Sequence, residues 1–129
     1  WEMARFAAEV DRDASPADLE GIVFVRLTGP LFFANADTLR ARVADQLAGP
    51  ARWVMLDFES VTDIDPTASD ALDDVVEMAQ SADRILGITR ASAAVHELLD
   101  RYGITDQIGS ERIYASNRAA LAAQLEELG

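Results

Sequence analysis

Two carboxylates and two hydroxyls flank a proline in the stretch VTDIDPTAS. Asp63 and Asp65 precede Pro66, and Thr67 and Ser69 follow it. Proline is favoured at the first position of a helix, and an Asp before it can accept hydrogen bonds from the first turn. The stretch therefore predicts a helix that begins at Pro66 and is capped by Asp65. Because the free N–H groups of a helix N-terminus also bind phosphate, a ligand-binding interpretation stays open beside the structural one.

A phosphate bound beside Asp63 and Asp65 would meet electrostatic repulsion. At about 6 Å and an effective dielectric constant of about 20, each carboxylate costs on the order of 3 kcal/mol per pair of unit charges. A magnesium ion or the guanidinium of Arg90 would have to offset this cost. We therefore expect that a nucleotide such as GTP, GDP or ATP binds weakly and together with Mg²⁺.

Ser92, His96 and Asp100 have the residue types of a hydrolase triad. The spacing of four places His96 and Asp100 on one face of a helix, but no G-x-S-x-G sequence surrounds Ser92. We interpret these residues as a solvated helix face and expect no catalytic residue and no enzyme activity. The acidic pair Asp73 and Asp74 lacks the alternating spacing of a calcium loop, and the chain has no Cys, so we expect no metal site.

The composition is that of one globular domain. The chain has 129 residues, of which 50% are hydrophobic and 26% are charged. This is enough for one core and argues against wholesale disorder. The 23 acidic and 11 basic residues give a net charge of −12, which makes nucleic acid and anionic membrane surfaces poor partners. No apolar run reaches the roughly 18 residues of a membrane span. The chain opens at Trp1, with Met3 inside it, and we expect it to be part of a longer protein.

Apolar runs and amphipathic stretches alternate along the chain, and they position the residues described above. We expect strands at 22–27, 31–33, 53–56, 85–88 and 113–114, preceded by a short edge strand within 3–10 and a linker at 11–20. We expect helices with apolar stripes at 36–47, 68–79, 95–102 and 121–128, with Asn35, Ser92 and Ser116 as N-caps and Gly103 in a left-handed C-terminal position. Such alternation indicates a mostly parallel sheet. Its functional loops, at 28–35, 57–66 and 89–92, then gather at the carboxyl ends of the strands.

Three stretches together resemble the STAS domains of SulP-type anion transporters. The sequence GPLFFANA at 29–36 resembles the strand-to-helix entry of that family. The sequence WVMLD at 53–57, followed eight residues later by Asp65, resembles the central strand and the loop into the second helix. The sequence LLDRYGI at 98–104, followed by Ile108 and Gly109, resembles the third helix and its turn. The first stretch is quite specific, whereas the other two also occur in stand-alone STAS proteins such as anti-sigma-factor antagonists.

The resemblance implies an α/β fold of the STAS type, with a mixed, mostly parallel sheet and about four α-helices. It also implies that residues 21–129 form a cytoplasmic, C-terminal regulatory domain and that residues 1–20 hold the link from a membrane domain and the first strand. The transporter would carry sulfate, bicarbonate or a dicarboxylate, lie in the inner (plasma) membrane and form a homodimer. The implied partners are the transmembrane domain of the same transporter and a cytosolic protein, with no role for nucleic acid.

The predicted nucleotide- or partner-binding loop site comprises Asn35, Asp63, Asp65, Thr67, Ser69, Arg90 and Ser92. Stand-alone relatives switch partners by phosphorylation of a Ser that directly follows the Asp before the second helix. Here that position is Pro66, which has no hydroxyl, so Thr67 is the remaining phosphoacceptor. The alternative function is therefore a free partner-switching protein of the anti-sigma-factor-antagonist type, modified at Thr67 or Ser69. A third hypothesis is a small nucleotide-responsive module with residual hydrolysis, for which we expect binding at most, because no residue set assembles a nucleophile, a base and an oxyanion site.

Overall fold

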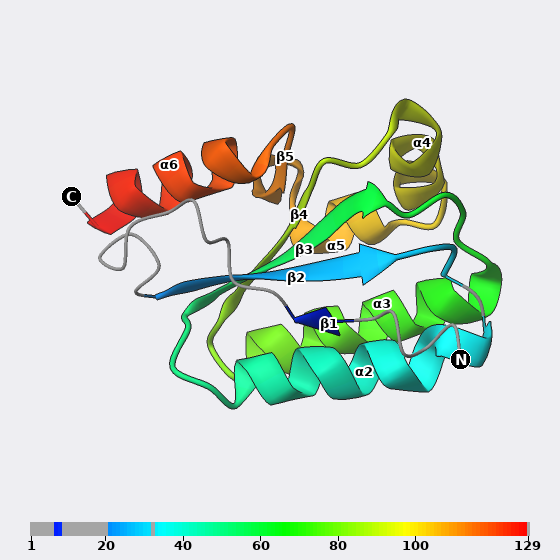
Figure 1. Cartoon of the computed structure of the whole chain (residues 1–129), viewed down its shortest axis with the longest axis horizontal. Helices are drawn as coiled ribbons and strands as arrows, with labels where there is room; N and C mark the ends of the chain where they lie inside the picture. The colour runs from blue at the N-terminus through cyan, green and yellow to red at the C-terminus, as the bar shows by residue number, and fades with distance from the viewer. Residues whose placement is uncertain (1–6, 9–20, 32, 129) are drawn as a thin grey trace.

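The centre of the fold is a five-stranded β-sheet (Figure 1). The computed structural model describes residues 7–8, 21–31 and 33–128. The strands are β1 (Ala7–Ala8), β2 (Ile22–Thr28), β3 (Trp53–Ser60), β4 (Ile85–Thr89) and β5 (Ile113–Tyr114). Their order in the sheet is the order in the sequence. β1 pairs with β2 in the antiparallel sense, and the other four strands are parallel. The sheet is thus mostly parallel, as the alternating pattern predicts, and mixed, as the resemblance implies.

Five α-helices and one short 3-10 helix connect and cover these strands within the described residues. They are α2 (Phe33–Leu47), α3 (Pro66–Ser81), α4 (Ala93–Arg101), α5 (Ile104–Ile108), η2 (Ser110–Arg112) and α6 (Asn117–Leu128). The four predicted helices are present. The fifth, α5, is only five residues long, too short to produce a helical period in the sequence. None of the helices in the described ranges is both long and apolar enough to cross a lipid bilayer.

The two faces of the sheet are covered unequally. Alternate residues of β2, β3 and β4, among them Val25, Leu56 and Ile88, join α2, α3, α4 and α5 in the larger hydrophobic core. The opposite face forms a smaller core of five buried residues: Ile22, Phe24, Trp53, Met55 and Ala120. Figure 1 shows α6 on the side of the sheet opposite to α2 and α3. The half-buried residues Leu121 and Ala123 of α6, together with Ile85 and Tyr114, pack against this smaller core.

Predicted helix caps agree with the structure at three places. Asp65 is the N-cap of α3 and Pro66 is its first residue. Ser92 caps α4 by accepting a hydrogen bond from the N–H of Val95. Ser116 accepts from the N–H of Ala119 in the first turn of α6 at 3.0 Å. Local residue chemistry is therefore sufficient to fix these helix starts.

The start of α2 was predicted wrongly. Of the expected strand 31–33, Leu31 forms an isolated bridge with Ile64 and Phe33 is already the first residue of α2, whereas Phe32 lies outside the described residues. Asn35 is therefore inside the helix and is not its N-cap. Its side-chain Nδ2 donates to the carbonyl oxygen of Pro30 at 2.8 Å, which ties the helix start to the preceding turn. The apolar residues around Leu31 suggest a regular strand. Leu31 instead pairs with Ile64, which is distant in the sequence, and this contact depends on the tertiary structure.

The N-terminal expectations are covered only in part. The strand expected within 3–10 is confirmed at Ala7–Ala8, where it pairs with Val25 and Arg26 of β2. The other residues of that range and the predicted linker 11–20 lie outside the described residues.

Candidate functional site

The loops that follow β2 and β3 form one structural unit at the carboxyl end of the sheet. The N–H of Leu31 donates to the carbonyl of Asp63 at 2.9 Å, and the N–H of Asp65 donates to the carbonyl of Leu31 at 3.0 Å. The hydroxyl of Tyr102, at the end of α4, donates to the carbonyl of Ile64 at 3.2 Å. The structure thus brings the predicted residues Asp63 and Asp65 next to the first loop and links both loops to α4.

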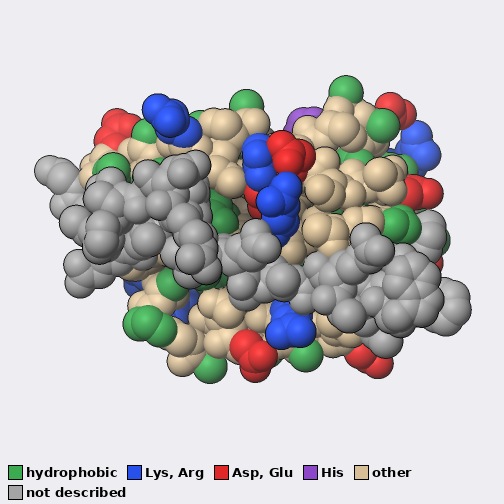
Figure 2. All heavy atoms as spheres, in the orientation of Figure 1, with side chains coloured by type: hydrophobic (Ala, Val, Ile, Leu, Met, Phe, Trp, Pro, Cys, Tyr) green, Lys and Arg blue, Asp and Glu red, His purple; other side chains and the backbone are tan. Residues whose placement is uncertain are grey.

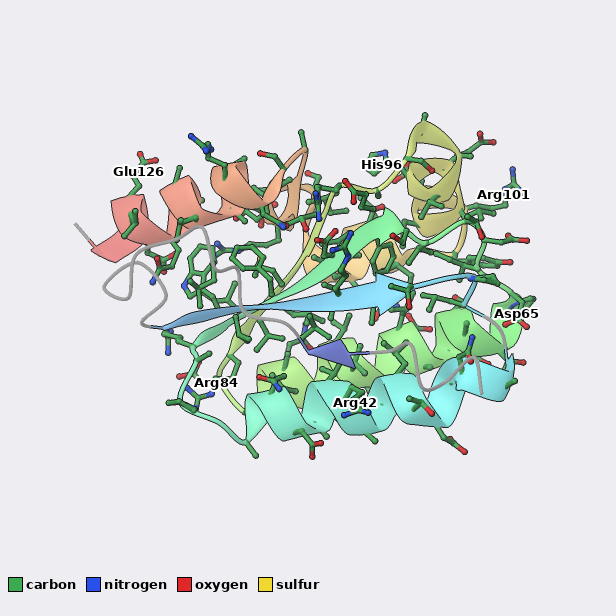
Figure 3. All side chains as sticks on the ribbon, in the orientation of Figure 1. Arg42, Asp65, Arg84, His96, Arg101 and Glu126 are labelled. Carbon is green, nitrogen blue, oxygen red and sulfur yellow. The ribbon has the colours of Figure 1, made fainter. Side chains whose placement is uncertain are left out.

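The N-terminus of α3 uses Asp65 as a structural cap. Asp65 Oδ1 accepts from the N–H of Ala68 at 2.8 Å, which satisfies one of the free donors of the first turn. Asp63 is exposed, and its Oδ1 accepts from the adjacent N–H of Ile64 at 2.9 Å. Figure 3 shows Asp65 at the opposite end of the molecule from Arg84, which precedes β4. The acidic loop therefore lies at the end of the domain where parallel strands collect their binding loops.

The two hydroxyls of this helix differ in accessibility. Thr67 is exposed on the first turn of α3, whereas Ser69 is buried, with 5% of its surface exposed. Asn35 is also 5% exposed. Of the predicted loop site, Asp63, Thr67 and Ser92 are exposed, so these residues can meet a ligand or partner without a change in the fold.

A buried carboxylate that was not in the predicted site organises the neighbouring loop. Asp57 lies within β3 and is 3% exposed. Its Oδ1 accepts from Arg90 Nε at 3.1 Å and from the N–H of Glu59 at 3.0 Å. Its Oδ2 pairs with Arg90 Nη2 and accepts from Asn117 Nδ2 at 3.1 Å. The hydroxyl of Thr89 hydrogen-bonds Asn117 Oδ1. We call Asp57, Glu59, Thr89, Arg90 and Asn117 the Asp57 network.

The charge of Asp57 is stabilised by these donors. Burial alone would raise the pKa of Asp57, because a carboxylate loses its hydration inside the protein. Hydrogen bonds from Arg90, from the N–H of Glu59 and from Asn117, together with the positive charge of Arg90, outweigh burial and hold this pKa below its ordinary value of 3.8. Asp57 is therefore ionised at neutral pH. The four hydrogen bonds that it accepts indicate a structural role.

Arg90 is held by carboxylates on β3. In addition to Asp57, Arg90 Nη1 pairs with Glu59 Oε2 at 2.8 Å, and Glu59 Oε1 pairs with Arg26 Nη2 at 3.2 Å. The backbone of Arg90 has φ +59°, and its N–H donates to the carbonyl of Tyr114. This left-handed conformation is costly for a residue other than Gly, so the network around it over-determines the turn. Arg90 is consequently engaged with Asp57 and Glu59, which limits its use as the counter-charge for a nucleotide.

Sheet register explains why these side chains meet. Arg26, Asp57 and Thr89 are in line across β2, β3 and β4, because Arg26 is the Cα partner of Asp57 and Asp57 is the Cα partner of Thr89. Figure 2 shows basic and acidic side chains side by side near the middle of the visible face. The one sequence signal for Asp57 was a carboxylate that interrupts an apolar strand, WVMLDF.

The residues resembling a triad do not assemble one. Ser92 Oγ accepts from the N–H of Val95 as a helix cap. His96 Nδ1 lies 4.0 Å from Asp100 Oδ2, and Asp100 Oδ1 accepts from the hydroxyl of Thr105. Within the described residues, no three His, Asp or Glu side chains are grouped in a way that could hold a metal ion.

Comparison with known proteins relates both the sequence and the fold to one family. The family model for the STAS domain matches residues 15–120. A probable sulfate transporter of Mycobacterium tuberculosis is 30% identical over 118 residues, which are 89% of this chain and 21% of that protein. The chain therefore spans about a fifth of that relative.

Two solved structures have a similar arrangement of helices and strands. The SulP transporter STAS domain of Vibrio cholerae superposes with a TM-score of 0.73 at 26% identity, over 91% of this chain and 88% of the other. A protein of Thermotoga maritima assigned as an anti-sigma factor antagonist superposes with a TM-score of 0.72 at 17% identity, over 95% and 96%. The second likeness shows the fold alone.

Proposed function

The chain belongs to the STAS domain family, and from this premise we propose that it is the cytoplasmic regulatory domain of a SulP-type anion transporter. The observation that supports the proposal is the 30% identity to a probable sulfate transporter along nearly the whole chain. The domain would act by contact and not by turnover. Its native partners would be the transmembrane domain of the same homodimeric transporter and a cytosolic protein.

The proposed contact surface is the exposed part of the loops that follow β2, β3 and β4, up to the first turns of the helices after them, and we call these loops the loop unit. Asp63, Thr67 and Ser92 are exposed at one end of the sheet. Asp63 lies on a loop that backbone hydrogen bonds fix, Thr67 lies on the first turn of α3, and Ser92 follows Arg90 of the Asp57 network. A rigid scaffold that presents exposed loops is typical of binding sites. Arg90 and Asp57 connect the turn before Ser92 to β3.

Attachment to a transporter can be tested on the coding sequence and on the native protein. We expect several apolar spans of about 20 residues upstream of Trp1. We also expect the native protein to sediment with membranes. A small cytosolic protein without such spans would contradict the proposal.

Regulation can be tested by surface substitutions in the native transporter. Asp63→Lys should change the uptake rate of labelled sulfate, bicarbonate or dicarboxylate into proteoliposomes. Glu126→Lys is the matched control, because Glu126 is an exposed acidic residue on α6, far from the loop unit (Figure 3). Equal uptake by the wild type and both variants, with all three proteins folded, would refute a regulatory role for the loop.

A second candidate function is partner switching by a free domain. The observation that favours it is the exposed hydroxyl of Thr67 on the first turn of α3. A phosphate there would interact favourably with the helix N-terminus, although Asp63 and Asp65 would repel it. Intact-mass and fragment analysis of protein isolated from its native cells tests this candidate. Phosphate on Thr67 would support it, whereas protein unmodified under all growth conditions would count against it.

For nucleotides, we propose weak binding that needs Mg²⁺. The acidic residues Asp63 and Asp65 disfavour a phosphate, and Arg90 is already paired with Asp57 and Glu59. Titration of GTP with Mg²⁺ at millimolar concentration, followed by amide NMR shifts, tests this proposal. The amides of 63–69 should move, and a spectrum without change would end it.

A further inference from the structure

A mostly apolar groove runs between α2 and α3, on a part of the surface separate from the loop unit. The groove is shallow and open to solvent, and its volume is about 970 Å³. Both helices follow parallel strands and lie side by side along the same face of the sheet (Figure 1). The floor and walls include Ala41, Ala44, Leu47, Ala48, Met78 and Ala82. Of these, Ala41, Ala48 and Ala82 are exposed, and Ala44 and Met78 are half-buried.

The small side chains along the groove allow another backbone to approach closely. Packed helices lie about 8–10 Å apart, and alanine at the contact favours the short end of this range. An α-helix satisfies its own backbone hydrogen bonds, so it can lie over apolar side chains without leaving polar groups unpaired. The shape and chemistry of the groove therefore fit a third helix better than an extended segment.

Acidic residues border the groove. Asp37, Asp74 and Glu77 line it together with Arg40, so three carboxylates against one guanidinium give a net charge of −2. Arg40 pairs with both Asp74 (2.8 Å) and Asp37 (3.1 Å). Glu77 is exposed, and its side chain makes no hydrogen bond or ion pair with another described residue. A complementary partner must therefore carry positive charge beside its apolar side.

We propose that the α2–α3 groove binds an amphipathic, cationic helix of a partner protein. The apolar side of that helix covers Ala41, Ala44 and Met78, and its Lys or Arg residues approach Glu77 and Asp74. Helix-in-groove recognition of this kind combines spaced apolar anchors with flanking charges. The inference does not depend on attachment of the domain to a transporter.

Charge argues against two other occupants. A second copy of this chain carries the same net charge of −12, and its α2–α3 surface repeats the same carboxylates. An anionic lipid surface would be repelled by the rim for the same reason. Neither occupant supplies a cationic side chain that could pair with the carboxylate of Glu77.

The experiment uses the isotope-labelled 129-residue chain and a synthetic peptide of 15 residues, the length of α2. The peptide has Leu and Ala on one helical face and Lys on the other. It should move the amide NMR signals of the groove residues and gain helical circular dichroism on binding. A peptide of the same composition with its apolar face scrambled should bind at least tenfold more weakly. Equal binding by the scrambled peptide would overturn the proposal, because it would show charge attraction without docking.

Matched variants separate the groove from general electrostatics. Glu77→Lys should weaken peptide binding about fivefold, since a favourable pair between Glu77 and a peptide Lys becomes a repulsive pair of two Lys side chains. Ala41→Gln, which fills the groove without a change of charge, should also weaken it. The controls Glu126→Lys and Ala122→Gln alter exposed positions of α6, on the other side of the sheet, and should leave binding unchanged.

Three further results would overturn the proposal. The first is equal weakening by the α6 controls. The second is a concentration-dependent shift of the groove signals in the protein alone, which would identify a second copy as the occupant. The third is binding to phosphatidylglycerol vesicles through the same residues, which would identify a membrane. A folded spectrum for each variant confirms that a loss of binding is not a loss of structure.

Discussion

Replacing Asp57 by Asn keeps the shape of the side chain but removes the charge that Arg90 neutralises. Separation of a buried ion pair typically costs 3–5 kcal/mol. The cost here should lie at the lower end, because the Arg90 side chain is 30% exposed and keeps its pairing with Glu59 at 2.8 Å. We therefore expect the free energy of unfolding to fall by about 3 kcal/mol at neutral pH.

Urea unfolding measured by circular dichroism is a direct assay. With a slope of about 2 kcal/mol per molar urea, a loss of about 3 kcal/mol moves the midpoint down by about 1.5 M. Asp63→Asn is the matched control, because Asp63 is exposed and accepts from one neighbouring N–H. The control should lose less than about 0.5 kcal/mol.

The pH dependence of the difference in unfolding free energy between the wild type and Asp57→Asn tests whether the charge of Asp57 causes it. The pKa of Asp57 in the folded protein is below the ordinary 3.8, so its ionised form stabilises the fold above pH 3.8. This contribution is lost as the pH falls through the folded-state pKa, and the difference between the wild type and Asp57→Asn should shrink there. Equal midpoints at pH 7, or a difference that is the same at pH 7 and well below pH 3.8, would refute the reasoning.

Three further substitutions test the helix cap, the strand packing and the core that hold the site in place, and each is measured by the change in the urea midpoint. Asp65→Ala should cost about 1 kcal/mol through loss of the bond to the N–H of Ala68, and an unchanged midpoint would show that this cap contributes nothing. Gly87→Ala should cost about 1–3 kcal/mol, because a Cβ there would lie 2.7 Å from the carbonyl oxygen of Arg112; full stability would contradict this close approach. Leu56→Ala should cost about 2–5 kcal/mol, since Leu56 is fully buried, and a loss below 1 kcal/mol would place it outside the core.

Much of the fold could be predicted because its signals are local. The apolar run that begins at Trp53 indicates a strand covered on both faces, and β3 has buried side chains from Trp53 to Phe58. The Asp–Pro step at 65–66 specifies a helix start through one side chain and one ring. Where a short segment pairs with a distant one, as Leu31 does with Ile64, local rules predict a strand that does not form.

The candidate site was predicted less completely. The positions of Asp63, Asp65 and Thr67 follow from the helix start, but the sequence could not show that Ser69 faces inward and that Thr67 faces outward at the same terminus. The sequence indicated Arg90 as a candidate site residue but did not indicate that Asp57 is its partner. The interpretation of Ser92 as a helix cap agrees with its bond to the N–H of Val95.

The sequence by itself determined where most strands and helices begin and which family the chain resembles, because hydrophobic period, capping residues and turn residues act within a few positions. Only the tertiary structure decided that Asp57 meets Arg90, 33 residues away, and Asn117, 60 residues away. It also decided that α2 and α3 leave an acidic-rimmed groove between them. These features depend on strand register and on the packing of whole elements, and no short stretch of the chain encodes them alone.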